Sequence, residues 1–270
     1  MFDPKKFAVA SAKPLPVYLL LDVSTTMGKV EDAENLKRTG EKFFEDGQHW
    51  EVVENGTTKM DILNVAVKKM LDIFSEEKKM DSEIIVSIIT FGDTADLFIS
   101  PTKASEIEWT DMAAKGETAL GAALKRTKEM IEDKKITLSR AYRPAIVLVS
   151  DGKPTDNWKE PLDDFINAGR SKKCDRMAMA VGKDADENVL KRFIKGTEHE
   201  LFSSNDAEKI SEFFERVTMS VTIRTRSQNP NKVPEDKDFD TESARVVEKS
   251  DLPNIKTKSD EELSTDDFEW

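Results

Sequence analysis

The sequence predicts an α/β protein with a doubly wound, mostly parallel β-sheet and helices on both faces. Short, continuously apolar runs, such as residues 17–21 and 145–150, are typical of strands buried on both sides. Other segments place apolar residues three and four positions apart, as amphipathic helices do. Strands and helices that alternate in this way along a chain form parallel sheets with helices on both faces.

The expected elements alternate along most of the chain. We expect strands at 17–21, 84–91, 95–99, 145–150, 176–181 and 201–202, and helices at 60–74, 119–134, 162–172, 187–195 and 207–221. The Gly92-Asp93-Thr94 turn should join strands 84–91 and 95–99 as an antiparallel pair.

The chain divides into three expected parts. Residues 1–14 are interpreted as a flexible lead and residues 15–222 as the folded domain. An insertion at 29–57 interrupts this domain, and its mild helical pattern predicts a helix followed by a short extended piece. Residues 223–270 are acidic, contain several prolines and have few apolar residues, so we expect a disordered tail.

Composition indicates which classes of partner to expect and in which cellular compartment the protein would lie. The net charge of −12 repels phosphate backbones, so nucleic acid is not an expected partner. The single cysteine, Cys174, excludes an internal disulfide and fits a reducing compartment. No segment resembles a signal peptide or the roughly 20-residue apolar span of a membrane helix. We therefore expect a cytoplasmic protein that does not bind membranes.

Polar side chains follow the predicted strands at three places. Asp22, Ser24 and Thr26 come directly after the first strand, Thr118 precedes a helix, and Asp151 directly follows a buried strand. In open parallel sheets, ligands bind beyond the carboxyl ends of the strands. Two carboxylates and three hydroxyls are hard oxygen ligands, which predicts a site for Mg²⁺ first, with Mn²⁺ or Ca²⁺ as alternatives. The protein would supply at most five oxygens. An octahedral ion would then have one coordination position left, which a ligand's carboxylate can fill.

Together with Gly152, these positions resemble the metal-ion-dependent adhesion site (MIDAS) of von Willebrand factor type A (VWA) domains. The resemblance covers about residues 15–222, and the motifs match in order and in their place at strand ends. It implies that Ser24 and Thr26 bind the metal directly, and that Thr118 does so when a ligand is bound. It also implies a protein-binding module that is not an enzyme.

Two details of the resemblance concern individual positions. The aspartates at the positions of Asp22 and Asp151 usually act on the metal through water. Thr26 departs from the family, in which serine is commoner at this position, but both residues carry a hydroxyl on the same carbon.

Within the family, segments 15–22, 89–91 and 116–121 look most similar to bacterial TerY-type proteins. These are associated with tellurite resistance and chemical stress. The resemblance implies a scaffold or adaptor in a cytoplasmic stress-resistance or defence assembly. Its partners would offer an acidic side chain, and they would include kinase or phosphatase components.

Other interpretations remain open at this stage. Asp22 and Ser24 could simply cap a helix. A metal-dependent phosphohydrolase could use the same oxygens, but it would need a general base, and the only histidines are His49 and His199. An adaptor for an AAA+ ATPase is a further alternative. The terminal residues 266–270 resemble a short docking motif.

Overall fold

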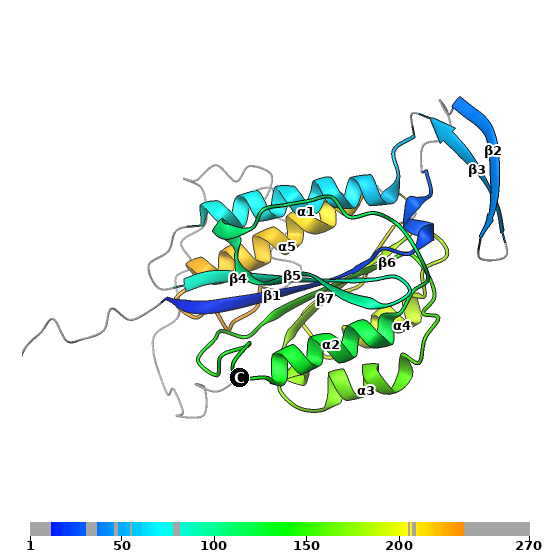
Figure 1. Cartoon of the computed structure of the whole chain (residues 1–270). Helices are drawn as coiled ribbons and strands as arrows, with labels where there is room; N and C mark the ends of the chain where they lie inside the picture. Colours follow the sequence, from blue (N-terminus) through cyan, green and yellow to red (C-terminus); the bar gives the residue numbers. More distant parts are fainter. Residues whose placement is uncertain are drawn as a thin grey trace, which may run out of the picture.

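The computed structural model describes residues 12–30, 37–45, 48–54, 56–77, 82–204, 206 and 209–234. It confirms the predicted α/β fold, with a six-stranded sheet between two layers of helices (Figure 1). The strand order is β5-β4-β1-β6-β7-β8, and β5 alone runs antiparallel to its neighbour. No helix among the described residues is long and apolar enough to cross a lipid bilayer.

The predicted elements of the sheet and its helices all occur, with shifted ends. The strands are β1 (Lys13–Asp22), β4 (Ser82–Phe91), β5 (Ala95–Lys103), β6 (Ala145–Ser150), β7 (Asp175–Val181) and β8 (Phe202–Ser204). The helices are α1 (Lys59–Glu76), α2 (Leu120–Glu132), α3 (Lys159–Asn167), α4 (Glu187–Phe193) and α5 (Lys209–Arg226). Short 3₁₀ turns are η2 (Thr25–Gly28), η3 (Ala104–Glu106) and η4 (Ser171–Lys173).

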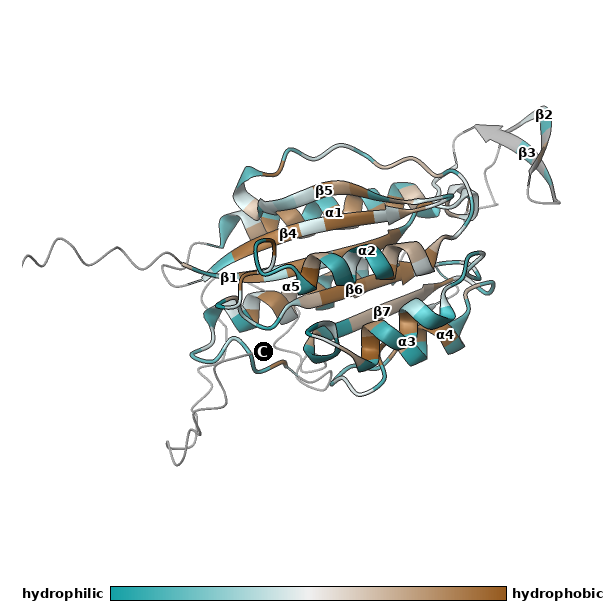
Figure 2. Cartoon of the chain, turned by 60° about the horizontal axis from the view of Figure 1, so that its bottom comes forward, coloured by the Kyte–Doolittle hydropathy of each residue, from teal (hydrophilic) through white to brown (hydrophobic). Residues whose placement is uncertain are grey.

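The central strand β1 shows why the apolar runs are continuous. Leu19 and Leu21 pack into the core shared with α1 and α5, whereas Tyr18 and Leu20 pack into the core shared with α2, α3 and α4. Successive side chains of a strand point to opposite faces, so a strand covered on both sides needs apolar residues at every position. Figure 2 shows this as hydrophobic strands facing the hydrophobic sides of the helices.

The winding of the chain reverses at β1. This strand pairs with β4 on one side and with β6 on the other, both in parallel. The chain first passes through α1 to β4, and later passes through α2 to β6 on the opposite side of β1. The carboxyl ends of β1 and β6 therefore border the crevice where such sheets bind ligands.

The sequence predicts a helix and then a short extended piece for the insertion at 29–57, but both halves of its described part are extended. Its described part forms two antiparallel strands, β2 (Lys37–Glu45) and β3 (Gln48–Glu54), which project as an arm from the domain (Figure 1). Gly40 has a φ of 82°, which a right-handed helix does not allow. Trp50 and Val52 fall at alternate positions, the period of a strand, and they lie in β3, where the sequence predicts the short extended piece.

The end of the domain also lies beyond residue 222. Helix α5 continues to Arg226, and the described chain packs on the domain as far as Pro234. The guanidinium of Arg224 is fully buried, 3.4 Å from the carboxylate of Asp175, and it donates a 2.9 Å hydrogen bond to the Pro230 carbonyl. This buried ion pair fixes the end of α5 to the start of β7.

At the other end of the chain, β1 begins at Lys13, inside the segment that was expected to be a flexible lead. The rest of that segment, residues 1–11, and the part of the expected tail at 235–270 lie outside the described residues.

Two truncated chains, ending at residues 222 and 234, test whether residues 223–234 belong to the folded domain. A chain ending at residue 222 should be less stable than one ending at residue 234, by about 3–5 kcal/mol, because loss of Arg224 leaves Asp175 buried without its charged partner. Urea unfolding followed by circular dichroism measures the difference. Equal midpoints for the two truncated chains would show that residues 223–234 do not stabilise the domain.

The arm should be dispensable for folding. Val30 and Thr58 form an isolated antiparallel bridge, so the two ends of the insertion are adjacent. Replacing residues 31–56 with a short Gly/Ser linker should leave the melting temperature within a few degrees of the full chain. A broad or missing thermal transition in this variant would instead assign the arm to the core.

Candidate metal centre

The structure brings the three sequence motifs together at the carboxyl ends of β1 and β6. Asp22 is the last residue of β1, Asp151 directly follows β6, and Thr118 lies just before α2. All three side chains are buried. Ser24 and Thr26 lie in the turn after β1, so all five predicted positions belong to one site.

A cluster of oxygen atoms forms the middle of this site. The hydroxyl oxygens of Ser24 and Thr26 are 2.9 Å apart. Both hydroxyls point to Oδ1 of Asp151, at 3.5 Å from Ser24 and 2.7 Å from Thr26. Two hydroxyls from one loop therefore converge on a single carboxylate oxygen from another.

The Thr118 hydroxyl lies across Gly152 from this cluster. A side-chain carbon added at Gly152 would lie 3.3 Å from Oγ1 of Thr118 and 3.9 Å from Oγ1 of Thr26. Glycine at this position thus leaves space between the two threonine hydroxyls. Within the described part of the chain, the Thr118 hydroxyl has no hydrogen-bond partner, so its oxygen is available to a ligand.

Asp22 holds the first loop in place. Its Oδ1 accepts a 2.9 Å hydrogen bond from the backbone N–H of Ser24, and its Oδ2 accepts a 2.6 Å hydrogen bond from the Ser150 hydroxyl. Burial raises the pKa of Asp22 to about 7, and the negative charge of Asp151 adds to this rise. Ser150 was not among the predicted site residues, although it immediately precedes Asp151.

Lys59, the first residue of α1, also belongs to this cluster, although it was not among the predicted site residues. Its ammonium nitrogen lies 3.0 Å from Oδ2 of Asp151, and both side chains are almost fully buried. A usable signal was present in the sequence. Lys59 lies four residues before Leu63 and eight before Val67, on the apolar stripe of the helix, where a lysine is unusual.

Hydrogen bonds between the loops fix the position of Thr118. The N–H of Thr25 donates to the Gly116 carbonyl at 2.9 Å, and the N–H of Thr155 donates to the Thr118 carbonyl at 3.0 Å. Gly116 has a φ of 77°, and an added side chain there would collide with the Asp93 carboxylate. Hydrogen bonds between neighbouring loops therefore hold the site residues in place.

The chemistry of the donors indicates which metals would fit. No group of three or more His, Cys, Asp or Glu side chains that could hold a metal occurs in the described ranges. The oxygen site instead combines two carboxylates with three hydroxyls, the hard donors that Mg²⁺, Mn²⁺ and Ca²⁺ prefer. The residues present thus fit a hard divalent cation.

A family model for the von Willebrand factor type A domain matches residues 17–153. This range is half of the chain and contains all five predicted site positions. The chain belongs to the von Willebrand factor type A family. A search of curated protein sequences found no significant match to this VWA protein.

Solved structures share the VWA fold at low sequence identity. Proximal thread matrix protein 1 from the mussel byssus has a TM-score of 0.53 and 16% identity, over 77% of this chain and 46% of that one. A mutant of the PilB minor pilin from Streptococcus sanguinis has a TM-score of 0.51 and 12% identity, over 82% and 63%. A further structure of the mussel protein, with zinc in its MIDAS motif, has a TM-score of 0.51 and 16% identity, over 77% and 45%. This chain spans less than two thirds of each of them.

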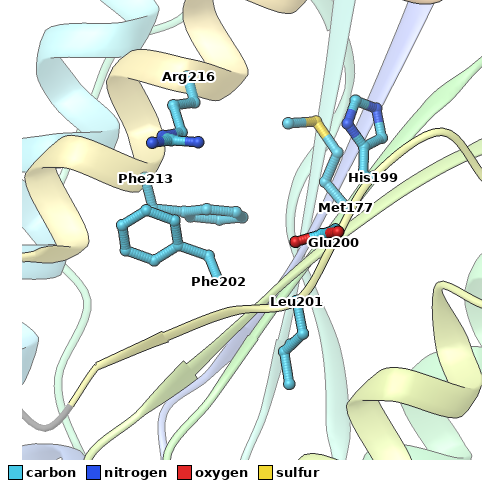
Figure 3. Close-up of a pocket in the computed structure, with 7 residues that line it drawn as sticks. All are labelled: Met177, His199, Glu200, Leu201, Phe202, Phe213 and Arg216. Atoms are coloured by element: carbon cyan, nitrogen blue, oxygen red, sulfur yellow. The ribbon is translucent and has the colours of Figure 1, made fainter. Parts of the chain in front are cut away.

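A small pocket of about 160 Å³ lies away from the strand-end site, beside β7, β8 and α5 (Figure 3). The rings of Phe202 and Phe213 are 5.7 Å apart on its wall, and the guanidinium of Arg216 lies 5.3 Å from the Phe202 ring. None of the predicted site residues lines it. These contacts are ordinary packing between the edge of the sheet and α5.

The raised pKa of Asp22 predicts a pH dependence in this VWA domain without metal. The folded state favours the protonated carboxyl, so this group stabilises the fold fully below its ordinary pKa of 3.8, and the contribution is lost as the pH rises through about 7. With a chelator present, the free energy of unfolding should fall between about pH 4 and pH 7, the interval between the two pKa values of Asp22. Asp22→Asn should flatten this dependence. If the free energy of unfolding, measured with urea, falls equally with pH in both proteins, the assignment is wrong.

Proposed function

We propose that this VWA domain is a metal-dependent protein-binding module, and that Asp22, Ser24, Thr26, Thr118 and Asp151 hold one divalent cation. The observation that carries the proposal is the convergence of the Ser24 and Thr26 hydroxyls on one carboxylate oxygen of Asp151. The bound cation would supply a coordination position that a partner's carboxylate fills, because hard cations favour carboxylate oxygen.

Mg²⁺ is the proposed physiological ion, with Mn²⁺ or Ca²⁺ as alternatives. The donor set supports a hard cation, since it contains only oxygen atoms. Zinc occupies the MIDAS motif in one structure of the mussel protein. Affinities for all four ions should therefore be compared directly.

The β2–β3 arm is the part of the domain that we propose contacts the partner and determines which partner binds. It follows η2, which contains Thr26, so its base lies at the same end of the sheet as the oxygen cluster (Figure 1). Phe44 on the arm is 64% exposed, and its ring lies 4.9 Å from that of His49. Exposed aromatic side chains are frequent anchors in protein interfaces.

We place the partner in a cytoplasmic stress-resistance or defence assembly, with kinase or phosphatase components. The support for this part of the proposal is the TerY-type resemblance of segments 15–22, 89–91 and 116–121. An adaptor role toward an AAA+ ATPase is the alternative within the same class of binding proteins.

The proposed role is not enzymatic. A phosphohydrolase would need a carboxylate or histidine able to take a proton from water. Both oxygens of Asp22 already accept hydrogen bonds, and Oδ2 of Asp151 is held by Lys59. Release of nitrophenol from p-nitrophenyl phosphate in the presence of Mg²⁺ or Mn²⁺ would favour the phosphohydrolase alternative.

A pair of substitutions at Thr26 tests metal binding. Thr26→Val keeps the shape of the side chain but removes the hydroxyl, and should weaken Mg²⁺ and Mn²⁺ binding by about tenfold or more. Thr26→Ser keeps the hydroxyl and should bind as the natural protein does. Isothermal titration calorimetry measures both affinities. Unchanged affinity in Thr26→Val would refute the proposed ligand set.

Partner binding should require the bound metal. Proteins captured by the chain from native lysate in Mg²⁺ should be lost in EDTA, and Thr118→Ala should reduce capture more than it reduces metal affinity. Capture that is equal in Mg²⁺ and in EDTA would contradict a metal-mediated contact.

A further inference from the structure

A buried lysine lies inside the proposed metal centre. The Nζ atom of Lys59 is 3.0 Å from Oδ2 of Asp151, and the two side chains are 6% and 0% exposed. Like the pair of Arg224 with Asp175, and unlike the surface pair of Lys69 with Glu215, this pair is removed from water. A charge pair removed from water is screened little by salt, so it acts strongly on any other charge in the site.

The fold fixes this ammonium group at its position. Lys59 is the first residue of α1, directly after the N-cap Thr58, whose hydroxyl and backbone form a capping box with Asp61. The N–H of Lys59 also donates to the Lys29 carbonyl at 3.3 Å. The start of the helix is therefore tied to the loop that carries Ser24 and Thr26.

The end of β7 encloses the ammonium from another side. A side-chain carbon added at Gly182 would lie 3.1 Å from Nζ of Lys59. Gly182 has a φ of 79°, and its N–H donates to the Ser204 carbonyl at 2.7 Å. The lack of a side chain at Gly182 thus leaves the space that the ammonium group of Lys59 occupies.

The two oxygens of Asp151 have different partners. Oδ2 accepts from Lys59, whereas Oδ1 receives the hydroxyls of Ser24 and Thr26. The lysine therefore lies on the side of the carboxylate away from the oxygen cluster. A cation can enter beside Oδ1 without displacing Lys59 from Oδ2.

The charge balance of the site follows from this arrangement. Two ionised carboxylates, Asp22 and Asp151, would together cancel a divalent cation and leave the loaded site neutral. The ammonium of Lys59 adds one positive charge, so the loaded site has a net charge of plus one. Such a site attracts an anionic ligand and holds its own metal less tightly.

We propose that Lys59 is a built-in counter-ion that weakens the intrinsic metal affinity of the site and directs the bound metal toward a carboxylate ligand. The inference rests on the proposed function, and it assigns to Lys59 a part in the preference of the site for an anionic ligand. In the metal-free protein, the same lysine offsets the buried charge of Asp151 and stabilises the site before metal binds.

A charge-removal variant tests the inference, with Mn²⁺ and acetate as probes. Lys59→Met keeps the apolar stem of the side chain and removes the charge. Calorimetry should show Mn²⁺ binding about tenfold or more tighter than in the natural protein. The melting temperature in EDTA should fall. Displacement of metal-bound water by acetate, followed by water-proton relaxation, should need a higher acetate concentration.

One control variant and one further test variant complete the experiment. Lys29→Met removes a lysine near the same loop whose ion-pair partner, Asp184, is 75% exposed, and it should change none of these quantities. Lys59→Gln removes the charge but can still donate a hydrogen bond to Asp151, and it should also tighten Mn²⁺ binding. If a Lys59 variant unfolds in EDTA, the Mn²⁺ concentration that restores its thermal transition gives the affinity.

The outcomes separate the two proposals. Mn²⁺ affinity that is unchanged or weaker in both Lys59 variants overturns the counter-ion role, because a lysine that only orients Asp151 would support metal binding. Absence of Mn²⁺ binding by the natural protein would instead overturn the proposed function itself.

Discussion

The burial of two carboxylates side by side is the constraint on which this structure depends. Strands β1 and β6 are in parallel register, so Asp22 and Asp151 leave the sheet at the same edge, and both are fully buried. Neighbouring negative charges removed from water are strongly unfavourable unless other groups compensate them. The rise in the pKa of Asp22 to about 7 expresses this cost directly.

The surrounding loops supply the compensation. Ser150 and the backbone of Ser24 donate to Asp22, while Thr26 and Lys59 donate to the two oxygens of Asp151. The winding of the sheet reverses at this point, which opens the crevice and brings loops from both halves of the sheet to one place. The proposed divalent cation would compensate the remaining negative charge, and the proposed role of Lys59 would leave the loaded site attractive to an anionic ligand.

The fold and the convergence of the five positions could be predicted from the sequence because each depends on local patterns, whereas their role as metal ligands stays a prediction. Continuous apolar runs marked the buried strands, and each site motif lay at the end of such a run or before a helix. Lys59 was missed because its role depends on a carboxylate 92 residues away. The end of the domain was misjudged for a related reason. In the sequence, Arg224 looks like part of the polar segment that follows it, and only its tertiary contacts, such as those with Asp175 and Pro230, make it a core residue. The arm was misread because Leu36, Phe43 and Phe44 also fit a helical spacing, whereas its strands stabilise each other by pairing.

We propose that the hydroxyls of Ser24 and Thr26, which both contact Oδ1 of Asp151, are ligands of a divalent cation. Anomalous diffraction from a crystal grown with Mn²⁺ tests it most directly. One strong anomalous peak should lie at bonding distance, about 2.1 Å, from both hydroxyl oxygens, with Lys59 still on Oδ2 of Asp151. A map with no peak at these hydroxyls, or with the ion held by other residues, would contradict it.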